Sequence, residues 1–103
     1  MAPPEREGAH SAGAARPQVA RLYRLQWETV QRAWVLLFPE GMIKLNGSAG
    51  EILRRCDGCR STGEIIAELE AAFHATAVGP EVEAFLQLAA GKGWVEWREA
   101  QPS

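Results

Sequence analysis

The chain has 103 residues, of which 47% are apolar and 23% are charged, so its composition is that of a globular domain rather than of a disordered chain. A domain of this size has a small core, which weighs against an enzyme with a deep pocket. The net charge of -2 does not favour nucleic acid as a partner. The longest uncharged apolar run, residues 33–39, falls far short of the about 20 residues that cross a membrane.

Charge is unevenly spread along the chain. Residues 19–60 carry seven basic and four acidic side chains, whereas residues 61–103 carry two basic and seven acidic ones. A domain with a basic half and an acidic half can orient a charged partner. Ordinary solvated faces also carry scattered charges, so both interpretations stay open at this point.

The two ends of the chain differ in composition from its middle. Residues 1–18 are rich in Ala, Pro, Gly and charge and have no large apolar residue after Met1, which predicts a flexible tail. Residues 99–103 are predicted to be a second, loose tail, which leaves a domain over residues 19–98. The first residues lack the apolar stretch of a signal peptide, so we expect a cytoplasmic protein.

Three strands are predicted in succession after the first tail. Residues 23–28 alternate between apolar and polar side chains, the pattern of a strand with one wet face. Residues 33–38 are apolar on both faces, which is typical of a central strand. Residues 39–41 read as a turn, and residues 42–45 follow as a short third strand. Because the connections are short, we expect an antiparallel meander.

Three helices are predicted to follow the strands. Ser48 and Glu51 have the spacing of a capping box that begins the first helix, and Ser61 and Glu64 repeat that spacing at the second. Pro80 suits the first turn of the third helix. Apolar residues at helical spacing mark the buried face of each helix. They are Ala49, Ile52, Leu53 and Cys56, then Ile65, Leu69, Ala72 and Phe73, then Val82, Phe85, Leu86 and Ala89.

The order of elements predicts an α+β domain with a winged helix-turn-helix-like build. In this build a three-stranded antiparallel sheet is followed by three helices. Residues 94–97 add a short extended segment that packs on the core. Because an indole ring removes a large area from water, we expect most of the four tryptophans in the core. These are Trp27, Trp34, Trp94 and Trp97.

A winged helix-turn-helix build raises the alternative of a DNA-binding protein, whose second helix would enter the major groove. The second predicted helix carries Glu64, Glu68 and Glu70 and has no basic residue between positions 61 and 75. Phosphates would repel such a helix. We therefore expect no nucleic acid as a partner, and we keep a DNA-binding protein only as an alternative.

Cys56 and Cys59 form a Cys-x-x-Cys pair, which raises the further alternative of a small redox or metal protein. A zinc site needs four ligands, and the two histidines, His10 and His74, do not form a ligand pair. The cysteines follow the end of a predicted helix, where the helix dipole does not favour a thiolate. We expect no metal, no cofactor and no catalytic residues, since no nucleophile–base pair, paired carboxylates or phosphate-binding loop is present.

Residues 36–66, LLFPEGMIKLNGSAGEILRRCDGCRSTGEII, resemble the PqqD family of pyrroloquinoline quinone (PQQ) biosynthesis. The resemblance rests on an ordered set of short pieces that extends to Gly93 and Trp94 and covers roughly residues 21–97. Two features depart from the family pattern, namely Cys59 after the Cys-Asp-Gly turn and the long first tail. No single piece is specific to the family, so the resemblance depends on the order in which the pieces occur.

The resemblance implies a role for the chain as well as a fold. PqqD-like domains are the prototype of the precursor-recognition element of ribosomally made, modified peptides. Such a domain is a non-catalytic peptide chaperone that binds the precursor peptide PqqA and presents it to the radical SAM enzyme PqqE. The peptide adds as a strand beside the third strand, in the cleft against the third helix.

The residues of the third strand and third helix are physically suited to that role. The third strand lies at an open sheet edge, whose unpaired N–H and C=O groups form a template for another strand. Leu88 and Ala84 form a second apolar flank beside Phe85, although Leu88 has the alternative of packing under Trp94 or Trp97. An open edge also allows a homodimer. The predicted peptide-binding residues are Met42, Ile43, Lys44, Leu45, Ala84, Phe85 and Leu88.

Overall fold

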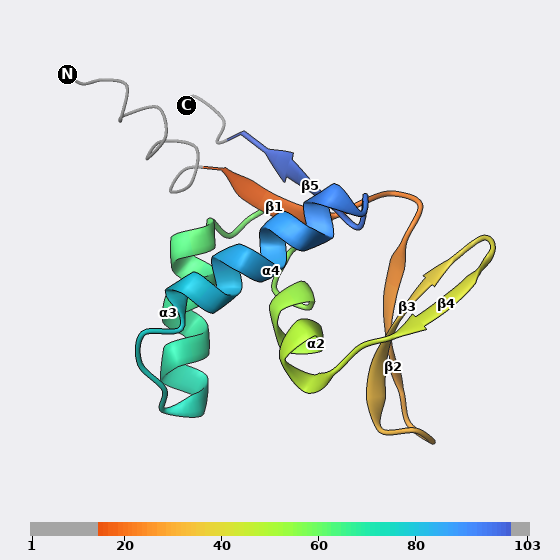
Figure 1. Ribbon diagram of the computed structural model, residues 1–103, viewed down its shortest axis with the longest axis horizontal. Coiled ribbons are helices and arrows are strands. Elements are labelled where there is room, and N and C mark those ends of the chain that lie inside the picture. The colour runs from red at the N-terminus through yellow and green to blue at the C-terminus, as the bar shows by residue number, and fades with distance from the viewer. Residues whose placement is uncertain (1–14, 100–103) are drawn as a thin grey trace.

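The computed structural model describes residues 15–99, so residues 1–14 and 100–103 of the tails expected at 1–18 and 99–103 lie outside the described residues. Along this part of the chain four strands are followed by three helices and a last strand, as Figure 1 shows. The elements are β1 (Arg16–Val19), β2 (Arg24–Glu28), β3 (Ala33–Phe38), β4 (Gly41–Lys44), α2 (Gly47–Leu53), α3 (Thr62–Phe73), α4 (Gly79–Gly91) and β5 (Val95–Arg98). The predicted α+β class, with a three-stranded antiparallel sheet and three helices, is confirmed.

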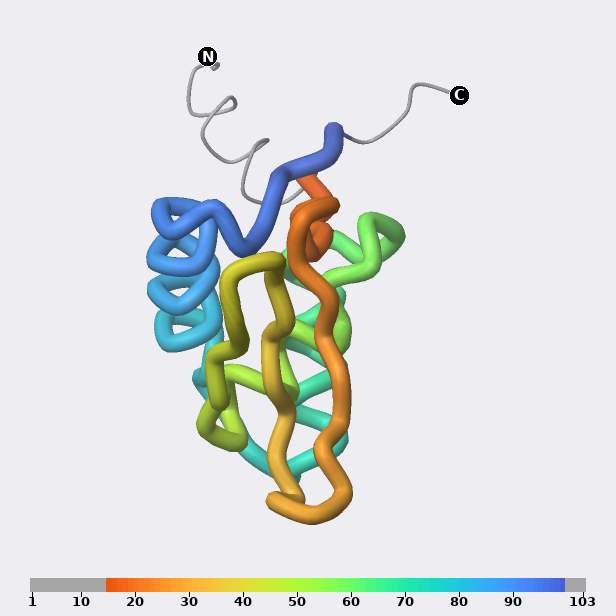
Figure 2. The backbone as a smooth tube through the Cα atoms, turned by 90° about the vertical axis from the view of Figure 1, so that its right-hand side faces the viewer, coloured from red at the N-terminus to blue at the C-terminus, as the bar shows by residue number. Residues whose placement is uncertain are grey.

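The larger sheet has the strand order β2-β3-β4, with both pairs antiparallel. Its register places Leu36 opposite both Leu25 and Ile43, so three apolar side chains share the inner face. Figure 2 shows α4 on the β4 side of this sheet and β2 on the far side. The sheet therefore presents β4, rather than β2, towards the third helix.

A second, two-stranded sheet joins the two ends of the described chain. β1 pairs with β5 in antiparallel fashion, and Pro17, opposite Trp97, is fully buried. The backbone also connects this sheet to the body, because Ala20 donates to the carbonyl of Trp94 over 2.8 Å. Residues 16–18 were expected in the flexible tail, so that expectation was wrong for these positions. The strand has no apolar alternation of its own and forms only because β5 supplies its partner from the other end of the chain.

Local hydrogen bonds set the ends of the helices. The side chain of Asn46 accepts the N–H of Ala49 over 2.8 Å, so α2 begins at Gly47 and not with a capping box at Ser48. Asn46 is an equally good cap two positions earlier, which is why the spacing misled. The predicted capping box of Ser61 and Glu64 is confirmed at α3, with both of its hydrogen bonds formed.

The core lies between the inner face of the sheet and the three helices. Leu36 of β3, Leu53 of α2, Ile65 of α3 and Leu86 of α4 are among its fully buried side chains. Because each helix contributes at least one such residue, the sheet and the helices share a single core.

Helix α2 and strand β3 approach each other at Gly50. A Cβ atom on Gly50 would lie 2.4 Å from Cδ1 and 2.8 Å from Cβ of Trp34, closer than real atoms come. Because only glycine lacks that atom, the contact between the helix and the sheet depends on it.

The expectation that most tryptophans lie in the core was wrong. Trp34 and Trp94 are partly buried and pack against it, but Trp27 is 47% exposed and Trp97 is 40% exposed. Trp27 lies on an outer strand and forms a T-shaped pair with Trp34, with ring centroids 5.3 Å apart. Trp97 lies on the small β1–β5 sheet.

Within residues 15–99, no helix has the length and apolar character that a membrane crossing requires.

Candidate functional site

Strand β4 has one edge without a strand partner among the described residues. The N–H of Leu45 donates to the carbonyl of Trp34 over 2.9 Å, which places that pair in the hydrogen-bonded position of the ladder. Bonded and non-bonded pairs alternate in antiparallel sheets, so Ile43 also bonds inward. Met42 and Lys44 lie in the non-bonded pairs and direct their N–H and C=O groups to the free edge. The edge therefore offers two sets of unpaired backbone groups.

The β4 side chains divide between the two faces of the sheet. Ile43 lies on the inner face and packs against the core, whereas Met42 is 52% exposed and Lys44 is exposed. Leu45, just after the strand, is buried in the core. Of the four residues predicted to bind a peptide here, Leu45 thus has neither its side chain nor its N–H at the free edge.

On α4, one apolar row is buried and a second flanks it. Of the four residues expected in the buried row, Val82, Leu86 and Ala89 are buried, whereas Phe85 is not fully buried. Phe85 is partly buried against the core, Leu88 is 51% exposed and Ala84 is exposed. Leu88 is therefore available to a partner rather than packed away beneath a tryptophan. Three predicted residues of α4 thus lie outside the buried row, where a bound segment can reach them.

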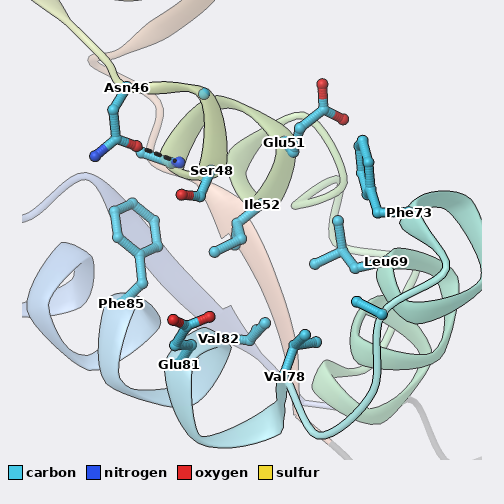
Figure 3. A pocket seen from close by; sticks show the side chains of 13 residues that line it. Asn46, Ser48, Glu51, Ile52, Leu69, Phe73, Val78, Glu81, Val82 and Phe85 are labelled. Atoms are coloured by element: carbon cyan, nitrogen blue, oxygen red, sulfur yellow. Dashed lines mark hydrogen bonds between the residues drawn. The ribbon is translucent and has the colours of Figure 1, made fainter.

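A pocket of about 580 Å³ lies between the start of α2, the end of α3 and the first half of α4. Figure 3 shows Phe85 and Phe73 on opposite sides, with Ile52 and Val82 between them. The lining residues are Asn46, Gly47, Ser48, Ala49, Glu51, Ile52, Leu69, Phe73, Ala75, Val78, Glu81, Val82 and Phe85. We call this feature the end pocket.

The sequence did not predict the end pocket. Phe73 and Ala72 were expected on the buried face of α3, but Phe73 is 54% exposed and Ala72 is exposed. Only Thr62, Ile65 and Leu69 of α3 are buried. The helix ends at Phe73, just before a left-handed His74, so its last turn extends past the core. A large aromatic residue in the last turn of a helix was the one available signal.

The connection between α3 and α4 forms one wall of the end pocket. His74 and Ala77 have φ angles of 52° and 58°, in the left-handed region that disfavours residues with a Cβ atom. The carboxylate of Glu70 accepts the N–H of Val78 over 3.1 Å and fixes the end of this connection. This hydrogen bond ties the connection to the last turns of α3.

A network of charges fastens α2 to α3. Glu68 accepts hydrogen bonds from Arg55 over 3.3 Å and from Arg60 over 2.9 Å, and Arg60 also pairs with Asp57. Arg55 in turn reaches Glu51 at 2.8 Å. The hydrogen bond from Arg55 lowers the pKa of the Glu51 carboxyl below its usual range. These opposite charges pair with one another and connect the turn between the two helices to both of them.

The two cysteines have different environments. Cys56 is buried, and its thiol donates to the carbonyl of Ile52 over 3.3 Å. Burial, aided by the neighbouring Asp57, raises the pKa of Cys56 to about 12, so its thiol stays protonated and is a poor nucleophile. Cys59 is exposed, and the two form no disulfide. Within residues 15–99, no three side chains of His, Cys, Asp or Glu are grouped to hold a metal ion.

The family sequence model described as "Coenzyme PQQ synthesis protein D (PqqD)" matches residues 33–95, which span β3 to the start of β5. This chain belongs to the PqqD family. A relative from Stutzerimonas stutzeri named "PqqA binding protein" is 45% identical over 80% of this chain and 90% of its own length. A relative of the same name from Klebsiella pneumoniae is 46% identical over 79% and 89%.

One solved structure of a PqqD domain agrees with this assignment, and a second solved structure shares the fold. The PqqD truncation of Methylobacterium extorquens PqqCD, described as a stand-alone recognition element of ribosomally synthesized and modified peptides, is 30% identical with a TM-score of 0.61. The match covers 78% of this chain and 87% of that one. The heterocyclase TruD, at 16% identity and a TM-score of 0.64, shares the fold over 86% of this chain and 12% of its own.

Proposed function

We propose that this PqqD-family chain binds the precursor peptide PqqA as an added strand on the free edge of β4. We further propose that it presents the bound peptide to the radical SAM enzyme PqqE. The names of the relatives as PqqA binding proteins support the choice of peptide. The mode of binding rests on one observation, the outward backbone groups of Met42 and Lys44 beside an exposed apolar flank of α4.

Strand addition divides the work between backbone and side chains. The unpaired N–H and C=O groups of β4 supply hydrogen bonds that any extended peptide can make. Selectivity comes from the side chains beside the edge, namely Phe85 and Leu88 of α4, which offer apolar contact, and Lys44, which attracts an acidic residue. The proposed role is therefore binding and presentation, with the chemistry left to PqqE.

A proline at position 44 tests the strand-addition mode. Lys44→Pro removes an N–H at the free edge, while Lys44→Val keeps that N–H and removes only the charge. We expect Lys44→Pro to bind a PqqA peptide about tenfold more weakly than Lys44→Val, measured by calorimetric titration, since an edge hydrogen bond and its neighbours are lost. Equal affinities of the two variants would contradict strand addition.

Ile43→Pro serves as the matched comparison within the same strand. Its N–H bonds inward to β3, so this change should weaken the sheet itself and lower the melting temperature, unlike Lys44→Pro.

Leu88→Asp places a charge on the exposed flank and should weaken peptide binding without unfolding the domain. If Leu88→Asp left PqqA binding unchanged, the flank of α4 would not be part of the site.

Presentation to PqqE is tested separately. We expect the cross-linking of PqqA by PqqE to slow with Lys44→Pro, at subsaturating concentrations, in proportion to the lost affinity.

A second copy of this chain is the competing occupant of the β4 edge. If dimers persisted when PqqA was saturating, the peptide and the second copy would occupy different sites. At most one of the two would then lie on the β4 edge.

A further inference from the structure

The end pocket is continuous with the proposed peptide site. Phe85 belongs to both, because it lies on the exposed flank of α4 and also lines the pocket. Asn46, two residues after the end of β4, lines the pocket together with Ser48, opposite α4 in Figure 3. A strand added to β4 that continues past Lys44 therefore arrives at the mouth of the pocket.

The inner lining of the end pocket is apolar. Ile52, Leu69, Val78 and Val82 line it from three helices and the α3–α4 connection. Its volume of about 580 Å³ is within the range of ligand sites, whose walls are mostly apolar and largely preformed. Ala77, in the connection between the lining residues Ala75 and Val78, has a strained left-handed conformation of the kind that collects at ligand-binding sites. A bulky apolar group suits this space.

Two carboxylates lie at the pocket, and they differ in their partners. Glu51 is paired with Arg54 and Arg55. Glu81 is exposed, and among residues 15–99 it makes no ion pair. A ligand that enters the pocket thus meets one carboxylate without a basic side-chain partner among the described residues, which favours a basic group beside the apolar one.

We infer that the end pocket takes a large apolar side chain of the bound peptide, aromatic or long aliphatic, with a neighbouring Lys or Arg of that peptide at Glu81. This inference rests on the proposed function, because it treats the pocket as the continuation of the β4 edge. It adds the chemical class of the residues that are read and the direction in which they lie, beyond the end of β4 that leads to α2.

Variants of the pocket test the inference on the full peptide. Phe73→Ala removes an exposed aromatic wall, and we expect it to weaken PqqA binding about tenfold. Glu81→Gln should weaken it about two- to fivefold, and less at high salt, as for an exposed ion pair. Leu22→Ala and Glu83→Gln are matched controls, since they are exposed and do not line the pocket. Both should bind like the parent chain.

The outcomes separate this inference from the proposed function. If Lys44→Pro weakens binding while Phe73→Ala and Glu81→Gln do not, strand addition stands and the pocket inference is overturned. If both pocket variants weaken binding and Lys44→Pro matches Lys44→Val, the peptide uses the pocket without adding a strand. That result overturns the proposed mode of binding together with the continuity that the inference assumes.

Short probes test the pocket without PqqA. We expect acetyl-Phe-Arg-amide to shift the NMR signals of the Ile52, Val78 and Val82 methyl groups, and to bind more tightly than acetyl-Phe-Glu-amide or acetyl-Ala-Arg-amide. Glu81→Lys should reverse the preference between the first two probes. Shifts confined to other residues, no shifts at millimolar probe, or an unchanged preference in Glu81→Lys would overturn the inference.

Discussion

Helix α3 has a fastened end and an open end. At its start the Ser61–Glu64 capping box satisfies backbone groups, and the nearby Arg55, Arg60 and Glu68 tie the helix to α2. At its finish the chain leaves through the left-handed His74, and the exposed Phe73 borders the end pocket. The first end carries most of the side-chain hydrogen bonds of the helix, and the second carries most of its exposed apolar surface.

The difference between the two ends of α3 shows how a small domain can be stable and still expose an apolar binding surface. With a core this limited, exposed apolar surface is tolerated only where other interactions hold the backbone. The fastened end fixes the position of α3, so its last turn can leave an aromatic side chain uncovered. Changes at the two ends should therefore affect stability and binding differently.

The largest expected effect on stability comes from the capping box. Ser61→Ala removes the acceptor for the N–H of Glu64 and should lower the free energy of unfolding by about 1–2 kcal/mol, measured by urea denaturation. Glu64→Gln is the matched control, because a glutamine at this position also completes the box. Equal losses in the two variants would mean that charge, not the cap, stabilises this end.

A glycine at the open end should act in the opposite direction. Ala77→Gly relieves a left-handed backbone and should raise the free energy of unfolding by up to about 1 kcal/mol. Ala67→Gly, exposed in the middle of α3, should lower it by about 1 kcal/mol, since glycine disfavours a helix interior. The same substitution thus has opposite signs inside α3 and after it. Losses in both variants would contradict the left-handed conformation of Ala77.

Local patterns predicted most of the fold, whereas contacts between distant segments escaped prediction. The strands β2, β3 and β4 are hairpin neighbours, and alternation, apolar runs and the turn at residues 39–41 were enough to place them. Strand β1 pairs with β5, and Gln18 accepts a hydrogen bond from Arg98, 80 positions away. No short sequence window contains both partners, so Arg16–Val19 resembled the rest of the tail.

The candidate site was predictable only in part, for a similar reason. The β4 edge and the flank of α4 follow from strand order and helical spacing, although Leu45 faces the core and Phe85 faces two ways. The end pocket depends on where α3 stops relative to the core, which spacing does not reveal. Apolar periodicity places Phe73 in the buried row, while the early end of the core leaves it exposed.

A smaller effect is expected from the ion pairs that fasten α3. Glu68→Gln weakens contacts to Arg55 and Arg60 and should lower the free energy of unfolding by at most about 1 kcal/mol, because these charges are partly exposed. The loss should shrink in 0.5 M sodium chloride through screening. Glu40→Gln, an exposed residue at the β3–β4 turn, is the control and should show no loss. A loss that is independent of salt would contradict the electrostatic account of this end.

The smallest effect on stability, and a sharp one on reactivity, is expected at the two cysteines beside the fastened end. At pH 8 iodoacetamide should label one thiol per native molecule, at the exposed Cys59, and two after unfolding, because the burial that raises the pKa of Cys56 to about 12 also shields it. Cys59→Ser should abolish native labelling and leave PqqA binding unchanged.

Above the usual thiol pKa of about 8.5, the unfolded chain releases the Cys56 proton while the native chain keeps it, so the free energy of unfolding should fall as pH rises. Native labelling of Cys56 as fast as Cys59 would show that the turn between α2 and α3 opens readily, and the contrast between the two ends of α3 would be lost.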